Sequence, residues 1–136
     1  MLITFSKQEA RVPVTVLHLH GDLDASNYTD VIKKAQEAYE GGARDLLVDL
    51  SKVPYMSSAG LMSMHTVALV FSGEQIKVSD SGRPSFRALD PQRDQAASAH
   101  VKLFNPQPQV MQVLETVGLM QFFQVFTDLE EAVNSF

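Results

Sequence analysis

Short apolar runs separated by polar turns divide the chain into a regular succession of strands and helices. Residues 12–20 alternate two apolar faces, and a weaker alternation at 2–5 predicts a short strand before them, at a sheet edge. The run at 45–50 is apolar between two aspartates and too short for a helix, which is typical of a buried strand. Residues 100–104 and 122–126 predict two more strands.

Two helices are predicted in the first half of the chain from apolar residues that recur every three or four positions. The first begins after a cap at Ser26 or Asn27 and ends at the glycine pair 41–42, and the second spans 58–71. The expected buried positions are Tyr28, Val31, Ile32, Ala35 and Ala38 in the first helix and Leu61, Met64, Ala68 and Phe71 in the second.

Two further helices are predicted near the C-terminal end. Pro108 opens one and Gly118 closes it, with Val110, Val113, Leu114 and Val117 on one face. Thr127 is expected to cap the last helix, because Glu130 three residues later completes a capping box.

The order of these elements predicts a single α/β domain over residues 1–136. Strands that alternate with helices are joined by right-handed crossovers, so the sheet should be mixed and mostly parallel, with an antiparallel first pair. About five strands and four helices, packed mainly on one face, are expected. Segment 72–99 is polar and poorly periodic, and we expect a mobile insertion there with one helical turn around 86–89.

Composition and charge narrow the class of protein. The 136 residues carry a net charge of −5, which argues against a nucleic-acid partner, since phosphate backbones require clustered Lys and Arg. The chain has no cysteine, which excludes disulfides and thiolate metal sites. The N-terminal segment is too charged for a signal peptide, and no apolar run approaches the ~20 residues of a membrane span. A cytoplasmic domain without membrane insertion is expected.

Candidate chemistry in the sequence is sparse. His18 and His20 share one strand face, but no neighbouring ligand in the sequence completes a metal shell, so solvated side chains and no metal are expected. Neither GxSxG nor a phosphate-binding glycine loop occurs, which argues against a serine hydrolase and a nucleotide-binding enzyme. Asp22 and Asp24 are most simply the polar residues of a turn. No catalytic residue and no cofactor are expected.

One geometric expectation remains, at the ends of two neighbouring strands. The loop GDLDAS follows the strand at 12–20 and YMSSAG follows the strand at 45–50, and loops at the carboxyl ends of parallel strands lie together. Free amides at Ala59, Gly60 and Leu61 would favour an anion, and Gly60 would allow a close approach. The simpler alternative is that Ser57 or Ser58 only caps the helix.

The stretches VTVLHLHGDLDAS, LLVDLSKVPYMSSAGL and VKLFNPQPQVMQVLETVGLMQFFQVFTDLEEAV resemble the STAS family, the sulfate transporter and anti-sigma factor antagonist domains. The resemblance covers nearly the whole chain except 72–99. It implies a non-enzymatic bacterial switch that binds an anti-sigma factor acting as a serine kinase, and so frees a sigma factor for transcription. The kinase would phosphorylate a serine at the start of the helix after the third strand, and a cognate phosphatase would remove the phosphate.

The sequence departs from this family pattern at the phosphorylation motif. The usual form is Asp-Ser-Ser-Gly-Leu or Asp-Ser-Thr-Gly-Leu, and the alignment on Gly60 places Ala59 at the acceptor position. Either Ser58, or as second choice Ser57, replaces the acceptor, or the protein binds its partner without phosphorylation. Asp24 matches an acidic residue that the family carries near the switch serine, and Asp22 falls where an acid is also common.

The partner surface implied by the resemblance extends along the helix at 58–71. Met62, His65 and Leu69 form a stripe beside the inward-facing residues, and their exposure would suit docking; deeper burial of the helix is the alternative. The expected partner-binding residues are Asp22, Asp24, Ser57, Ser58, Ala59, Gly60, Met62 and His65.

Two other functions remain open. A STAS module can be the accessory subunit of a membrane transporter, or a sensor of nucleotides or small molecules that uses the same two loops. We expect a monomer or weak dimer.

Overall fold

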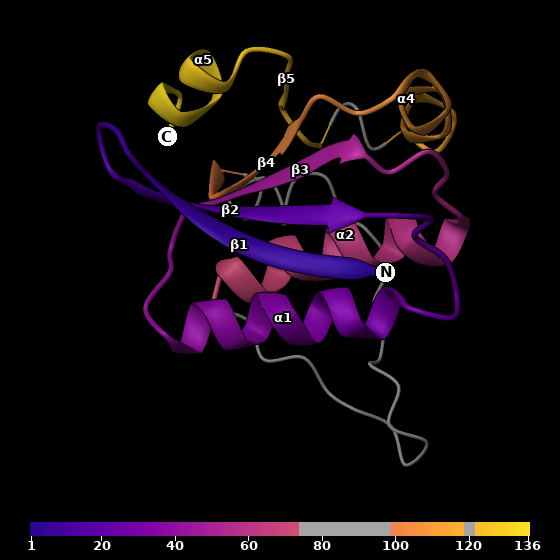
Figure 1. Ribbon diagram of the computed structural model, residues 1–136, viewed down its shortest axis with the longest axis horizontal. Helices are drawn as coiled ribbons and strands as arrows, with labels where there is room; N and C mark the ends of the chain where they lie inside the picture. Colours follow the sequence, from indigo (N-terminus) through magenta and orange to yellow (C-terminus); the bar gives the residue numbers. More distant parts are fainter. Residues whose placement is uncertain (74–98, 119–121) are drawn as a thin grey trace.

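A computed structural model describes residues 1–73, 99–118 and 122–136, and its elements follow the predicted order (Figure 1). Five strands form one sheet in the order β1-β2-β3-β4-β5. They are β1 (Leu2–Glu9), β2 (Pro13–His20), β3 (Leu46–Lys52), β4 (Val101–Phe104) and β5 (Val125–Phe126). The first pair is antiparallel and the other neighbouring pairs are parallel, which confirms the mixed, mostly parallel sheet.

The helices lie mainly on one face of this sheet, as predicted. They are α1 (Tyr28–Glu40), α2 (Ser58–Phe71), α4 (Pro108–Thr116) and α5 (Leu129–Asn134). Figure 1 shows α1 and α2 side by side against one face, with α5 on the opposite face. The buried residues Val110 and Leu114 of α4 belong to the same core cluster as those of α1 and α2.

Strand β2 divides its side chains between two cores because successive residues point to opposite faces. Leu17 and Leu19 are buried against the helices α1 and α2. Val14 and Val16 are buried on the other face, in a smaller cluster that includes Val133 of α5. Each fully buried aliphatic side chain contributes roughly 1.5–3 kcal/mol. The two-faced pattern of the sequence therefore reflects a central strand that is covered on both sides.

A buried lysine ties α5 to the sheet. Lys102 of β4 is 5% exposed, and its Nζ donates to the carbonyl oxygen and the hydroxyl of Ser135, at 2.8 and 3.0 Å. The Nζ also lies 4.6 Å from the ring centre of Phe136. Burial lowers the pKa of Lys102, with partial opposition from the charge of Asp45. The hydrogen bonds that the buried ammonium group donates to Ser135 compensate its charge and hold α5 against the sheet.

The ends of several elements differ from the prediction. Strand β1 extends to Glu9 because its polar second half stays in register with β2 from Thr15 to Pro13, as an edge strand allows. Strand β5 keeps only two residues, since pairing with β4 starts at Val125. Of the insertion expected over 72–99, residues 74–98, which include the helical turn expected around 86–89, lie outside the described residues.

Two predicted positions near the C-terminal end are wrong. Val117 is 50% exposed, because α4 ends at Thr116 and the chain leaves the buried face there. The cap of α5 is Asp128 and not Thr127: the Asp128 carboxylate accepts a hydrogen bond from the amide of Glu130 at 3.0 Å. The acidic side chain caps the helix one residue after the expected threonine.

Candidate recognition site

The two loops that follow β2 and β3 pair with each other, as the parallel topology predicts. The amide of Leu23 donates to the carbonyl of Tyr55 at 3.0 Å, and the amide of Ser57 donates to the carbonyl of Leu23 at 2.9 Å. Leu23 and Met56 form a parallel bridge beyond the named strands. The pairing continues the β2–β3 ladder into the loops, which fixes their relative position.

Gly60 makes this contact possible. A Cβ at position 60 would lie 2.8 Å from the carbonyl oxygen of Leu23 and 2.8 Å from Cγ of Met56. The space that glycine leaves is therefore occupied by the protein's own loop. The expectation that Gly60 admits a partner backbone or a phosphate is wrong, because the first turn of α2 packs directly on Leu23.

The serines at the start of α2 have different roles. Ser57 is the N-cap, and its hydroxyl oxygen accepts a hydrogen bond from the amide of Gly60 at 3.3 Å. Its carbonyl accepts the amide of Leu61 at 3.0 Å. Ser58, the first helical residue, is exposed, whereas Ala59 is half-buried and packs against the core. The position that matches the family's acceptor thus contributes a methyl group to the core edge.

The loop after β2 is ordered by its own side chains. The carboxylate of Asp24 accepts hydrogen bonds from the amide and the hydroxyl of Ser26, at 2.9 and 2.5 Å. These bonds lower the pKa of Asp24, so the side chain stays ionised at neutral pH. Asn27 accepts from the amide of Asp24 and donates to the carbonyl of Asp22. Asp22 is exposed, so the loop presents two acidic residues beside the start of α2.

Helix α2 is buried more deeply than a partner-binding helix would be. His65 is 2% exposed and Leu69 is 4% exposed, so the predicted exposed stripe is wrong for both residues. The ring of His65 stacks edge-to-face on Phe122, with ring centres 5.7 Å apart. Met62 is half-buried and is the one member of the stripe with access to solvent. His65 therefore belongs to the interior and not to the recognition surface.

A cluster that the sequence analysis missed lies on the sheet face away from α1 and α2. His18 is hydrogen-bonded on both ring nitrogens: Nδ1 lies 2.8 Å from Oδ2 of Asp49, and Nε2 lies 2.8 Å from the hydroxyl of Ser6. The expectation of solvated histidines is thus wrong for His18. Within the described ranges, no group of three or more His, Cys, Asp and Glu side chains could hold a metal ion. The register between the strands brings this cluster together, and the sequence alone does not give that register.

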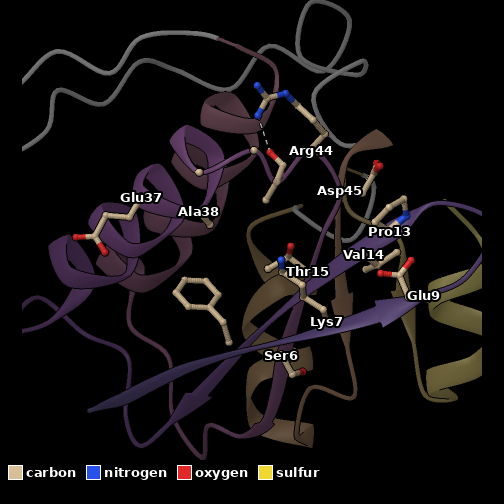
Figure 2. Close-up of a pocket in the computed structure, with 14 residues that line it drawn as sticks. Ser6, Lys7, Glu9, Pro13, Val14, Thr15, Glu37, Ala38, Arg44 and Asp45 are labelled. Atoms are coloured by element: carbon tan, nitrogen blue, oxygen red, sulfur yellow. Dashed lines mark hydrogen bonds between the residues drawn. The ribbon is translucent and has the colours of Figure 1, made fainter.

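A groove of about 850 Å³ lies at the other end of the strands, away from the two loops (Figure 2). Glu37 and Ala38 line it from α1, and Lys7 and Thr15 line it from the β1–β2 pair. Arg44 donates to the carbonyls of residues 39 and 43. The guanidinium also lies 4.0 Å from the ring centre of a tyrosine at position 39. Through these contacts, Arg44 packs against the C-terminal end of α1.

None of the described helices has the length and apolar character that crossing a bilayer requires. No curated protein matches the chain. Among solved structures, a Thermotoga maritima protein is 18% identical with a TM-score of 0.67, covering 95% of this chain and 91% of its own. An anti-sigma factor antagonist from Mycobacterium paratuberculosis is 16% identical with a TM-score of 0.62, covering 98% and 93%.

The same fold occurs in the anti-sigma factor antagonist SpoIIAA in its unphosphorylated form. That protein is 21% identical with a TM-score of 0.58, and the match covers 96% of this chain and 94% of SpoIIAA. SpoIIAA of Bacillus in its phosphorylated form matches at 18% identity and a TM-score of 0.56, covering 96% and 97%. The family described as "Mlab, STAS domain" matches residues 6–127 of this chain. The chain therefore belongs to the STAS domain family.

Proposed function

We propose that this protein is a non-enzymatic interaction switch that binds an anti-sigma factor of the serine-kinase type, and so frees a sigma factor. The docking edge comprises the loops at 21–27 and 53–58 together with Met62. The backbone pairing between these loops, through Leu23 and Ser57, carries the proposal. It holds two loops and a helix start in one arrangement before any partner binds, which reduces the entropy cost of association. The shared fold of anti-sigma factor antagonists supports this assignment.

The charge of the docking edge indicates the chemistry of the partner surface. Asp22 and Asp24 lie beside the start of α2, and the chain carries a net charge of −5. A partner with a basic patch would be attracted to this edge and oriented by it. The partner should therefore bind more weakly as the ionic strength rises. We place this interaction in the bacterial cytoplasm and expect the protein to act as a monomer or weak dimer.

Ser58 is the better candidate for phosphorylation of the two serines. It is exposed at the first position of α2, whereas Ser57 is half-buried and its hydroxyl caps the helix. A phosphate on Ser58 would add about −1.5 to −2 charge at a helix N-terminus, which stabilises negative charge. The fold would tolerate this phosphate, but its charge and bulk would change the docking edge. Solved structures of SpoIIAA in both phosphorylation states support this reasoning.

A pull-down from the source bacterium tests the partner class. Recovery of a GHKL-type kinase would support the proposal. Recovery of a transporter ATPase as the main partner would instead support the alternative that the protein is the accessory subunit of a membrane transporter. Ala59 favours this alternative, because such a subunit needs no phosphate acceptor. Heat released on titration with a nucleotide or a lipid would point to a sensor.

Variants at position 58 test the phosphate. Ser58→Asp should raise the stability of the fold by about 0.3–1 kcal/mol, because an acid is favourable at a helix N-terminus, yet weaken partner binding by at least about tenfold. Ser58→Asn has a similar size without the charge and serves as the control. Full-strength binding by Ser58→Asp, together with no phosphate on Ser57 or Ser58 after incubation with the kinase and ATP, would remove the phosphorylation part of the proposal.

A further inference from the structure

Three neighbouring strands place a serine, a histidine and an aspartate in one hydrogen-bonded chain. Ser6 comes from β1, His18 from β2 and Asp49 from β3. The Ser6 hydroxyl lies 2.8 Å from Nε2 of His18, and Nδ1 of His18 lies 2.8 Å from Oδ2 of Asp49. His18 pairs directly with Asp49 in the parallel register, while Ser6 sits diagonally across from it beside Val16. This cluster is separate from the docking edge.

The hydrogen bonds of Asp49 determine which group is the donor and which the acceptor in this cluster. Its other oxygen, Oδ1, accepts from the amide and the hydroxyl of Ser51, at 3.0 and 2.6 Å. Burial raises the pKa of Asp49, but the bonds from Ser51 and His18 outweigh burial and lower the pKa overall. The group is therefore a carboxylate at neutral pH and can only accept. Nδ1 of His18 must carry a proton that it donates to Asp49.

The tautomer of His18 follows from this bond. When Nδ1 of a neutral imidazole carries the proton, Nε2 has a free lone pair and acts as an acceptor. The hydroxyl of Ser6 then donates to Nε2. A serine hydroxyl that donates to a histidine, which is in turn oriented by a carboxylate, is the arrangement that activates a serine for nucleophilic attack.

The cluster is open to solvent at its reactive end. The side chain of His18 is 30% exposed, whereas that of Asp49 is 15% exposed. Ser6 is half-buried on the edge strand. The base and the nucleophile are thus accessible, while the orienting carboxylate is more shielded.

We propose that Ser6 is an activated nucleophile and a covalent modification site for electrophiles of the activated acyl or phosphonyl class. A fluorophosphonate serves as the probe. Oγ of Ser6 attacks phosphorus, the Oγ–P bond forms, and the P–F bond breaks. Fluoride leaves with the electron pair of that bond, and the hydroxyl proton passes to Nε2 of His18. The product is a phosphonate ester of Ser6, and Asp49 acts as a positioning residue.

The test is fluorophosphonate labelling of the full chain, followed by peptide mapping with mass spectrometry. General-base assistance is worth about 10²–10⁴-fold, so Ser6 should be labelled at least about a hundredfold faster than an unassisted serine. Ser72 is the internal reference, because it is exposed and, within the described residues, its hydroxyl donates to the backbone carbonyl of Leu69 and not to a histidine. Ser6→Ala should abolish the fast labelling, and Ser72→Ala should leave it unchanged. Equal rates at Ser6 and Ser72 in the wild-type protein would overturn the proposal, with no variant required.

Two variants separate activation from a structural role. His18→Gln keeps a hydrogen-bonding side chain but removes the base, and it should label at least about tenfold more slowly. Asp49→Asn should slow labelling by a similar factor and move the ring proton of His18 away from Nδ1, which ¹⁵N NMR of the imidazole reports. Circular dichroism establishes that each variant is folded. Labelling of folded His18→Gln at the wild-type rate would refute activation by His18.

Discussion

Gly60 is the residue whose replacement tests most directly how the docking edge is assembled. The variant Gly60→Ala introduces a Cβ 2.8 Å from the carbonyl oxygen of Leu23, and real Cβ contacts are essentially never that short. The nearest side-chain atom, Cγ of Met56, is equally close. The loop that contains Leu23 must therefore move away from the first turn of α2.

The cost follows from the contacts that this movement disturbs. Overpacking a close-packed site costs about 1–3 kcal/mol. The carbonyl of Leu23 also accepts the amide of Ser57, and weakening that bond costs a further ~0.5–1.5 kcal/mol. Alanine gains about 1 kcal/mol over glycine within a helix, which offsets part of the loss. We expect a net destabilisation of roughly 2 kcal/mol, which for a domain of this size lowers Tm by about 8 °C.

Thermal unfolding followed by circular dichroism measures this change. Gly41→Ala is the matched control, because Gly41 has a negative φ of −77° and the nearest atoms to its added Cβ lie at 3.3 and 3.5 Å. It should shift stability by less than about 0.5 kcal/mol. Amide exchange locates the effect: the amides of Leu23 and Ser57 should exchange faster in Gly60→Ala and stay unchanged in Gly41→Ala.

One result would refute this reasoning. If Gly60→Ala has the Tm of the wild-type protein and retains slow exchange at Leu23 and Ser57, the close packing of α2 on the loop does not hold the docking edge together.

The remaining predictions concern the helix ends, α4 and acid stability. Asp128→Ala should destabilise the protein by about 1 kcal/mol, whereas Thr127→Ala should change little; equal losses in denaturant unfolding would contradict the cap at Asp128. Leu114→Ala should cost about 2–5 kcal/mol because Leu114 is fully buried, and Val117→Ala should stay within about 0.5 kcal/mol; a large loss at Val117 would contradict its exposed position. The folded-state pKa of Asp49 is lowered, so its ionised form contributes stability above the unfolded value of about 3.9, and that contribution is lost as the pH falls through the lower folded-state pKa. Asp49→Asn should therefore lose less stability than the wild-type protein between pH 5 and about pH 3, as urea unfolding at each pH measures; an identical acid dependence would contradict the role of this carboxylate.

Local patterns determined most of the element order. The alternation at 12–20, the apolar run at 45–50 and the helical stripe of α1 predict their elements because each depends on which faces of a short segment are apolar. The meeting of the two loops was predictable as well, since it follows from parallel strand topology alone. The capped start of α2 at Ser57 or Ser58 was visible for the same local reason.

Only the tertiary structure decided the features that depend on register and on coverage by distant segments. The sequence shows that His18 and Asp49 lie on strands, but their contact and the approach of Ser6 depend on how three strands align. The residues of α2 are apolar on nearly all sides, so its sequence does not distinguish a half-exposed helix from a fully buried one. The burial of His65 therefore became clear only from the packing of α2 in the structure. The missing side chain of Gly60 suggested that a partner could approach there, but in the structure the backbone and side chain of Leu23 fill that space. The packing of a loop against a helix depends on the whole fold and not on either segment alone.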